Sequence, residues 1–180
     1  MTTSPLLTTE RFGLWQPAAT DLADLVHLLE GEEMIRYLGP ARPTALSQFD
    51  RLLRNAGSWS LYGYGVFYVR PHGSREIIAS CGVFHSWRGF GKGMDDEPEA
   101  GWIVRQDWWG KGVAGEAMCA VLPWFDEAHG PRRIACMIED GNDASVRLAD
   151  KLGFSPCGNH VAEDDDRALL NLFERLPVEG

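Results

Sequence analysis

The 180-residue sequence contains no apolar run that approaches the length of a membrane-spanning helix, which needs about 18 to 20 residues. It also lacks a signal-peptide pattern, in which a charged segment precedes a short apolar core. Repeats, low-complexity tracts and linker-like segments are absent as well. We therefore expect one domain over residues 1–180, soluble and cytoplasmic, without membrane contact and with residues 1–8 as a loose tail.

Positive charge is scarce, since 17 lysines and arginines stand against 26 aspartates and glutamates, for a net charge of −9. A surface of this sign repels nucleic acid and anionic lipid, so we expect neither as a partner. Paired cysteines are also absent, because Cys81, Cys119, Cys136 and Cys157 are widely spaced and form no C-x-x-C motif. Buried thiols in a reducing compartment are expected, in place of disulfides or metal ligands.

The most informative stretch is residues 108–117, WWGKGVAGEA, between the apolar runs Ala100–Val104 and Ile134–Ile138. Both runs are short and bounded by turn or charged residues, which is typical of strands. Between them, apolar residues recur at the spacing of a helix: Val113, Ala117, Val121 and Phe125. Two strands joined through such a helix should lie parallel. Gly110 and Gly112 then precede the helix N-terminus, where free N–H groups and the helix dipole favour a phosphate.

The spacing of these glycines differs from that of two other phosphate-binding motifs. A P-loop requires Ser or Thr after Gly-Lys, whereas Gly112 follows Lys111. Gly110, Gly112 and Gly115 match the G-x-G-x-x-G spacing of dinucleotide sites, but no second nucleotide-binding unit follows. A plain tight turn remains the alternative to an anion site. The second glycine-rich run, 88–93, leads into acidic residues and a strand, so we interpret it as a plain loop.

The remaining elements follow from periodicity and turn residues. They are a strand over 11–16, helices over 22–29, 44–56 and 142–152, and hairpins of 63–70 with 76–84 and of 156–161 with 168–174, the last around the acidic turn 163–166. Thr20 or Asp21 should cap the first helix. One apolar side of the second helix is expected to consist of Leu46, Phe49, Leu52 and Leu53. Pro123 should kink the central helix or shorten its regular part.

Four motifs occur along the chain in a characteristic order. They are Thr9–Leu14 (TERFGL), Glu99–Trp102 (EAGW), Trp109–Ala114 (WGKGVA), and Asn142–Ser145 (NDAS) followed by Lys151–Phe154 (KLGF). Together they resemble the GNAT N-acetyltransferases, and within them the RimJ/RimL-like branch. The superfamily usually carries Gln or Arg where Trp109 stands, although a Trp-Gly-Lys-Gly run is common in that branch.

This resemblance implies an α/β (α+β) fold, a mixed and largely antiparallel twisted sheet of about six to seven strands with about four helices. A parallel strand pair would splay apart at the site of acetyl-CoA, which is the acyl donor in this family. Its pyrophosphate would meet the glycine loop, formed by Trp109, Gly110, Lys111, Gly112, Val113, Ala114 and Gly115. Its pantetheine arm would pair with the strand Trp102, Ile103 and Val104, close to Asn142, and the N–H groups there could polarise the thioester carbonyl. Lys111 and Arg147 could add phosphate charge, or be solvated.

Acetyl transfer to an amine needs a base for the ammonium proton and an acid for the departing thiolate. Glu99 matches the acidic position of the family and is the candidate base; the alternative is a solvated strand-end residue. Ser145 lies on the apolar side of its helix, where a hydroxyl needs a partner. The Tyr that serves as acid in much of the superfamily is replaced by Ala149, so Ser145 or a water is the candidate acid; the alternative is a helix cap and packed hydroxyl.

Two aromatic residues are candidates for the acceptor site. His85 and Trp87 end a strand beside the expected cleft and are candidate substrate-binding residues. The lone H-x-x-E of His27 and Glu30 has no third ligand, so no metal site is expected. The predicted function is direct transfer from acetyl-CoA to a primary amine, on a small molecule or a protein N-terminus. A CoA-binding protein without catalysis, transfer to a hydroxyl, and a homodimer are left open.

Overall fold

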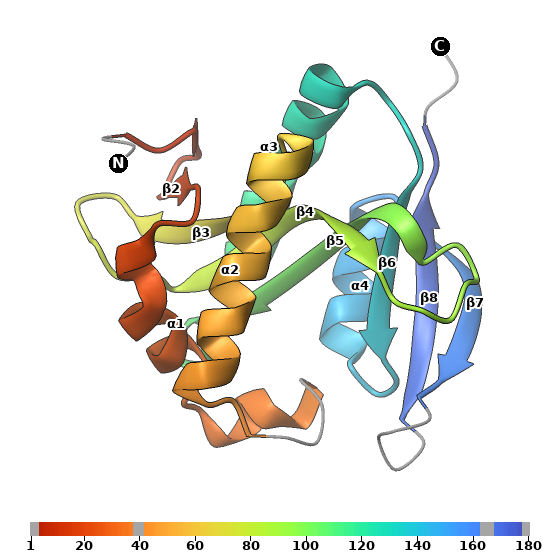
Figure 1. The fold of residues 1–180 in the computed structure, drawn as a ribbon, viewed down its shortest axis with the longest axis horizontal. Coiled ribbons are helices and arrows are strands. Elements are labelled where there is room, and N and C mark those ends of the chain that lie inside the picture. The colour runs from red at the N-terminus through yellow and green to blue at the C-terminus, as the bar shows by residue number, and fades with distance from the viewer. Residues whose placement is uncertain (1–3, 38–41, 163–167, 178–180) are drawn as a thin grey trace.

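The computed structural model describes residues 4–37, 42–162 and 168–177, which form one eight-stranded sheet with helices on both faces (Figure 1). The strand order is β1-β2-β3-β4-β5-β6-β8-β7, antiparallel throughout except between β5 and β6. The strands are β1 (Leu7–Thr8), β2 (Phe12–Trp15), β3 (Val66–Pro71), β4 (Ala79–Trp87), β5 (Asp95–Val104), β6 (Ile134–Glu139), β7 (Ser155–Val161) and β8 (Leu169–Arg175). The helices are α1 (Leu22–Leu28), α2 (Ala45–Tyr62), α3 (Val113–His129) and α4 (Asp143–Lys151), with the short turns η1 (Ala19–Asp21), η2 (Glu32–Tyr37) and η3 (Gln106–Trp108).

The mixed, largely antiparallel sheet predicted from the sequence is confirmed. It has one strand more than expected, because Leu7 and Thr8 pair with Leu14 and Gly13 of β2. Leu7 and Thr8 therefore do not belong to the loose tail that was expected over residues 1–8. The acidic turn expected at 163–166 lies outside the described residues.

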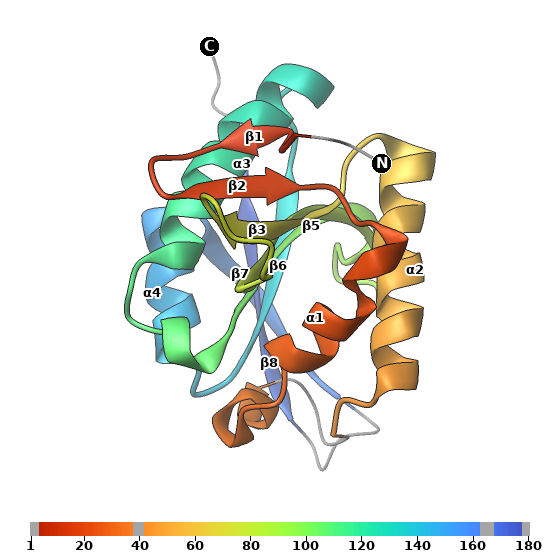
Figure 2. The same ribbon diagram turned by 90° about the vertical axis from the view of Figure 1, so that its left-hand side faces the viewer.

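Two hydrophobic cores lie on opposite faces of the sheet, as the alternation of side chains along β3 shows. Phe67 and Val69 pack into the core that contains α3, whereas Val66 and Tyr68 pack against α1 and α2. Figure 2 shows this arrangement edge-on, with α1 and α2 on one side of the sheet and α3 and α4 on the other. A strand buried on both faces explains why its residues form a continuous apolar run.

The sheet opens in its middle, between β5 and β6. These parallel strands pair at only two positions, Glu99 with Ala135 and Ala100 with Cys136. Beyond them β5 continues to Val104 and β6 to Glu139 without pairing to each other. The predicted splayed parallel pair is therefore present, and it leaves backbone groups of β5 facing a gap.

The central helix α3 buries the side predicted from its spacing, since Val113, Ala117, Val121 and Phe125 are each at most 2% exposed. The helix is continuous through Pro123, so the expected shortening is wrong. Both Pro123 and Cys119, whose carbonyl loses its intrahelical partner, lie on the exposed side. Water can satisfy that carbonyl there, and packing of the opposite side holds the helix together.

The second helix differs from its prediction in length and in orientation. It begins at a capping box between Thr44 and Ser47 and ends only at Gly63, whose φ is +77°. Of the four residues expected to form its buried side, Leu52 is buried, but Leu46, Phe49 and Leu53 are 70%, 44% and 54% exposed. The side that faces the sheet is mixed, because Gln48 and Ser58 are buried together with Leu52.

The first strand of the central strand–helix–strand unit, β5, begins at Asp95 rather than at Ala100, because residues 95–98 pair with the end of β4. A bulge between Ser86 and Trp87 accommodates the extra residue. The Asp95 carboxylate accepts hydrogen bonds from the N–H groups of Gly89 (2.5 Å) and Gly91 (2.7 Å), and these bonds lower its pKa. The loop 88–93 thus binds a carboxylate of its own chain, in agreement with the plain-loop interpretation.

Two smaller expectations also needed correction. The Asp21 carboxylate accepts from the Ala18 N–H and from Arg70, so it does not cap α1 as expected. Cys81 and Cys136 are buried, and burial raises the pKa of the Cys81 thiol to about 12. Cys119 and Cys157, however, are exposed.

No described helix is both long and apolar enough to cross a membrane.

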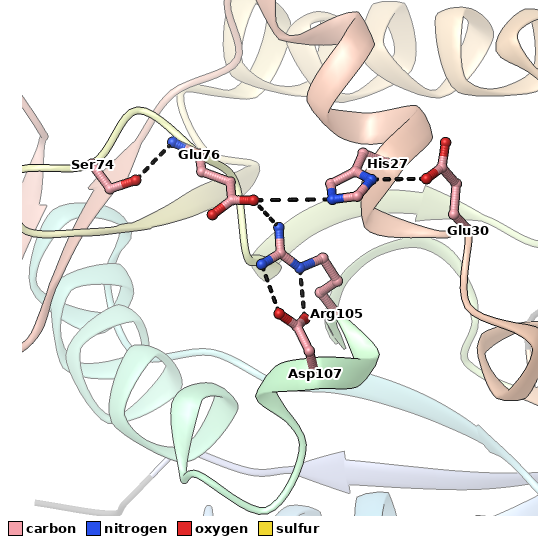
Figure 3. Close-up of polar contacts among 6 residues, drawn as sticks. All are labelled: His27, Glu30, Ser74, Glu76, Arg105 and Asp107. Atoms are coloured by element: carbon pink, nitrogen blue, oxygen red, sulfur yellow. Dashed lines mark hydrogen bonds and ion pairs between the residues drawn. The ribbon is translucent and has the colours of Figure 1, made fainter.

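The end of β5 is held by Arg105, whose guanidinium contacts two carboxylates (Figure 3). It binds Asp107 at 2.6 Å and 2.9 Å and also pairs with Glu76 from the β3–β4 connection. These contacts, led by the Asp107 hydrogen bonds, raise the pKa of Arg105. On the other side of Glu76, His27 lies 4.0 Å away and bonds to Glu30. Arg105 therefore fixes the point where β5 turns toward the glycine loop.

Candidate active site

A cavity of about 460 Å³ lies beside the gap in the sheet, with walls from α2, β4, β5, β6 and α4. Seven of the predicted site residues line it: His85, Trp87, Glu99, Trp102, Ile103, Asn142 and Ser145. Val104 and the glycine-loop residues 109–115 are not part of this lining. The structure therefore brings the candidate base, the candidate acid and the acceptor residues together, with the glycine loop further along the chain at the start of α3.

The backbone of β5 faces the gap at alternate residues. The Arg105 N–H donates to the Ile78 carbonyl of the β4 side at 2.8 Å. By the alternation of an antiparallel pair, Ile103 also bonds toward β4, whereas Trp102 and Val104 face the gap. The Val104 carbonyl is not free, because the Trp109 indole N–H donates to it at 2.7 Å. Of the three strand residues predicted to meet pantetheine, two present backbone groups in the required direction.

The glycine loop has the backbone conformation that its sequence predicts. Gly110 and Gly112 have φ of +71° and +74°, and Gly112 is the residue directly before α3. No atom lies within 4 Å of the place where a Gly110 Cβ would be. Val113 is buried, and Lys111 lies over the Trp108 ring with its Nζ at 5.1 Å from the ring centre. A ligand at this loop would therefore meet mainly backbone N–H groups, because the Val113 side chain is buried and Gly115 has none.

A contact that the sequence did not predict joins the N-terminal segment to the first turn of α3. The Glu116 carboxylate accepts hydrogen bonds from the Thr9 hydroxyl (2.6 Å), the Arg11 N–H (2.9 Å) and the Arg11 Nε (2.6 Å). Burial alone would raise the pKa of Glu116, but these bonds outweigh it and hold the pKa below its ordinary value. The Arg11 guanidinium also lies 3.6 Å from the Cβ position of Gly112. A positive side chain thus stands beside the glycine loop.

Ser145 has a partner of the kind its position required. Its Oγ accepts from the Trp102 indole at 3.2 Å, and its backbone N–H donates to the Asn142 side chain at 3.2 Å. Asn142 is therefore the cap of α4. Because the Ser145 oxygen serves here as acceptor, its own O–H remains able to donate into the cavity.

Glu99 is 3% exposed, so the alternative of a solvated strand-end residue is wrong. Both of its oxygens accept hydrogen bonds from Arg88, at 2.5 Å and 2.8 Å. Burial alone would lower the pKa of Arg88, but the bonds and charge of Glu99 raise it above its ordinary value. A carboxylate offers about four lone-pair positions, so Glu99 retains acceptor capacity toward the cavity. Arg88 was missed, since only the pairing of β4 with β5 reveals its contact.

Both ring nitrogens of His85 and one face of its ring contact other residues of the chain. Its ring nitrogens contact the Tyr64 hydroxyl and the Asp96 carboxylate, each at 2.9 Å, and its ring stacks on Tyr62 at 3.7 Å. Its polar groups are therefore already used. Trp87, at the end of β4, is 73% exposed.

Two arginines of α2 that the sequence analysis overlooked also line the cavity, Arg51 and Arg54. Together with Asn55 and Ser58 they form the polar side of the helix. Ser58 ties this side to the sheet, because its hydroxyl donates to the Tyr64 carbonyl (2.8 Å) and accepts from the His85 N–H (3.1 Å). The helical spacing of these polar residues was a usable signal. Among the described residues, no group of three His, Cys, Asp or Glu side chains could hold a metal ion.

Comparison with known proteins agrees with this geometry. Residues 11–155 match the acetyltransferase (GNAT) domain. An uncharacterized N-acetyltransferase of Bacillus subtilis, YoaA, is 24% identical over 155 residues, covering 86% of this chain and 85% of the relative. A Bordetella pertussis structure assigned to the GNAT acetyltransferase family is 30% identical, covers 94% of this chain and 98% of its own, and superposes with a TM-score of 0.83.

A more distant structure shares the fold alone. The ribosomal L7/L12 alpha-N-protein acetyltransferase RimL, solved in complex with coenzyme A, is 14% identical, with a TM-score of 0.73 and coverage of 96% of this chain and 97% of its own. The family match covers most of the chain and includes β5, the glycine loop and α3. The chain therefore belongs to the GNAT acetyltransferase domain family and is an acyltransferase.

Proposed function

We propose that this protein transfers the acetyl group of acetyl-CoA directly to a primary amine. One observation carries the proposal: the gap between β5 and β6 opens onto a cavity that holds Glu99 and Ser145. A thioester placed along this gap would lie between a carboxylate and a hydroxyl donor. This is the pair of groups that acetyl transfer to an amine requires.

Acetyl-CoA, the donor, would bind mainly to backbone groups of the protein. The N–H groups of residues 110–115 are suited to the pyrophosphate, because the two positive-φ glycines leave space beside the start of α3. The backbone groups of Trp102 and Val104 are suited to the pantetheine amides. Pairing with the Val104 carbonyl would require the Trp109 indole to give up its hydrogen bond.

Glu99 would receive or relay the proton of the acceptor ammonium, directly or through water. Its Arg88 partner keeps the carboxylate oriented and leaves lone pairs available for that contact. Ser145 would donate its O–H proton to the departing thiolate and take up the second proton that the amine nitrogen loses, which restores the hydroxyl. Cys136 also lines the cavity, but burial, together with the charge of Glu99, raises the pKa of its thiol. A thiol held in this protonated form is a poor nucleophile, which favours direct transfer over an acyl-enzyme.

We also propose membership of the RimJ/RimL-like branch, with acetyl-CoA as the donor. The structural likeness to RimL, a protein that acetylates a ribosomal protein and was solved with coenzyme A, supports this. The acceptor would be an amine on a small molecule or a protein N-terminus.

The test is thiol release from acetyl-CoA with a panel of primary amines, combined with the mass of each product. The expected result is release that depends on the amine and a product heavier by one acetyl group. Acetyl-CoA binding without thiol release for any amine or N-terminal peptide would show a CoA-binding protein without catalysis. Glu99→Gln serves as the matched control, because it keeps the side-chain size and removes the charge.

A further inference from the structure

The charges lining the cavity are unusual for so acidic a chain. Three arginines, Arg51, Arg54 and Arg88, and two glutamates, Glu99 and Glu139, contribute to its walls. Arg88 is neutralised by Glu99, and Glu139 lies at the end of β6 with contacts of its own. The positive charge of α2 is therefore the part of the cavity that lacks a matching carboxylate.

Within the described residues, neither Arg51 nor Arg54 makes a hydrogen bond or an ion pair. Other partly buried arginines in this structure do have such partners: Arg70 with Asp21, Arg88 with Glu99, Arg105 with Asp107, Arg133 with Glu174 and Arg175 with Asp126. Arg51 is half-buried, and its pKa is lowered by burial and by the charges of Arg54 and Arg88, whereas Arg54 is exposed. The Arg51 guanidinium is thus partly out of bulk water without a counter-charge, which is costly, and a ligand anion would relieve that cost.

The two arginines are also placed to act together. They stand three residues apart on α2, so they are neighbours on the same side of the helix. Asn55 lies next to them and donates its amide to the Tyr68 hydroxyl at 3.2 Å. The Ser58 hydrogen bonds to Tyr64 and His85 anchor this stretch of α2 to the sheet. Two neighbouring guanidinium groups on an anchored helix can bind an oxyanion through paired hydrogen bonds.

We propose that the acceptor amine carries an anionic oxygen group, a carboxylate or a phosphate, bound by Arg51 and Arg54. Its amine end would face Glu99 of β5 and the thioester, which share the cavity with these arginines. This inference rests on the proposed acetyl transfer and names the class of its acceptor. A neutral or purely cationic amine would leave the α2 arginines unpaired.

The experiment compares matched acceptor pairs that differ only in the anion. The pairs are 4-aminobutyrate with 4-aminobutanamide, O-phosphoethanolamine with ethanolamine, and the peptide Ser-Asp-Ala amide with Ser-Asn-Ala amide. The expected result is a kcat/KM at least about tenfold higher for the anionic member of at least one pair, as charge-assisted bonds to arginine predict. The first two pairs separate a carboxylate from a phosphate. Equal rates within every pair would overturn the inference while leaving acetyl transfer intact.

Variants connect the preference to the two arginines. Arg51→Gln and Arg54→Gln should each lower kcat/KM for the anionic acceptor by about tenfold or more and leave the neutral partner within about twofold. Arg75→Gln, at an exposed position outside the cavity, is the matched control and should change neither. Arg54→Glu should reverse the charge preference, so that a diamine becomes a better acceptor than the anionic amine. If Arg51→Gln and Arg54→Gln keep the wild-type preference for the anionic acceptor, neither arginine binds the anion and the proposal is refuted.

Discussion

Replacement of Ser145 by Ala tests whether its hydroxyl takes part in the chemistry or only in the fold. In the structure the Ser145 oxygen accepts the Trp102 indole N–H at 3.2 Å, while the O–H is left to donate. The cap of α4 does not depend on the hydroxyl, because Asn142 bonds to the backbone N–H of Ser145. Ser145→Ala therefore removes one hydrogen bond and one proton donor and keeps the helix start.

The two roles predict effects of different size. Losing the bond to the half-buried indole should cost about 0.5–1.5 kcal/mol, and each kcal/mol lowers the melting temperature by about 2–4 °C in a chain of this size. Losing a general acid typically costs about 10²–10⁴-fold in rate. We expect the low end, about 10²-fold, because the thiol pKa near 8.5 already makes the thiolate a tolerable leaving group.

Trp102→Phe provides the matched control, since it removes the same hydrogen bond from the donor side and retains the hydroxyl. Thermal melting and single-turnover acetyl transfer at saturating acetyl-CoA should be measured on both variants. Both should melt at a lower temperature, Trp102→Phe the lower of the two because Trp102 also packs against the core, and only Ser145→Ala should lose the rate of the chemical step. If Ser145→Ala loses stability and keeps the wild-type single-turnover rate, Ser145 is a structural residue and the reasoning fails.

Three further predictions address the donor site, the base and the N-terminal contact. Gly112→Ala should raise the KM for acetyl-CoA about tenfold or more, since a methyl group enters the loop. Gly73→Ala, at another glycine with positive φ, should cost similar stability and leave this KM unchanged. If the KM for acetyl-CoA is the same in Gly112→Ala and in wild type, the phosphate assignment is wrong. Glu99→Gln should lower turnover by about 10²–10⁴-fold with little change in acetyl-CoA affinity; a full-speed variant with a normal pH profile would contradict the base role. The lowered pKa of Glu116 adds stability above the ordinary carboxyl pKa of about 4.3, and this stability is lost as pH falls through the folded-state pKa. Melting curves between about pH 7 and pH 3 should thus show a smaller acid-induced loss for Glu116→Gln than for wild type, and parallel curves would argue against this contact.

The central unit could be predicted because its signals are local. The buried residues of α3 recur every four positions, and both flanking strands are short apolar runs, so neither depends on distant parts of the chain. The Ser145 partner was predictable in kind, because a hydroxyl on an apolar helix side needs one. Its identity as the Trp102 indole depends on how α4 docks against β5, which no local pattern encodes.

The polar part of the cavity shows where local reasoning stops. Glu99 meets Arg88 at the end of the paired strands β4 and β5, where a bulge at Ser86 and Trp87 shifts the register, and register shifts leave no clear trace in sequence. On α2, the apolar residues Leu46 and Phe49 suggested the buried side, yet they face outward. Amphipathicity identifies two sides of a helix, and tertiary packing decides which one is buried.

The opening between β5 and β6 also gives the folded protein two strand edges in the middle of its sheet. Unpaired backbone groups at an edge can pair with a strand of another molecule, which is a common route to aggregation. The Trp109 indole closes one of these groups by binding the Val104 carbonyl. A donor molecule lying in the same gap would close more of them. Purified protein should therefore aggregate more slowly with acetyl-CoA than without it, and Trp109→Phe should widen that difference.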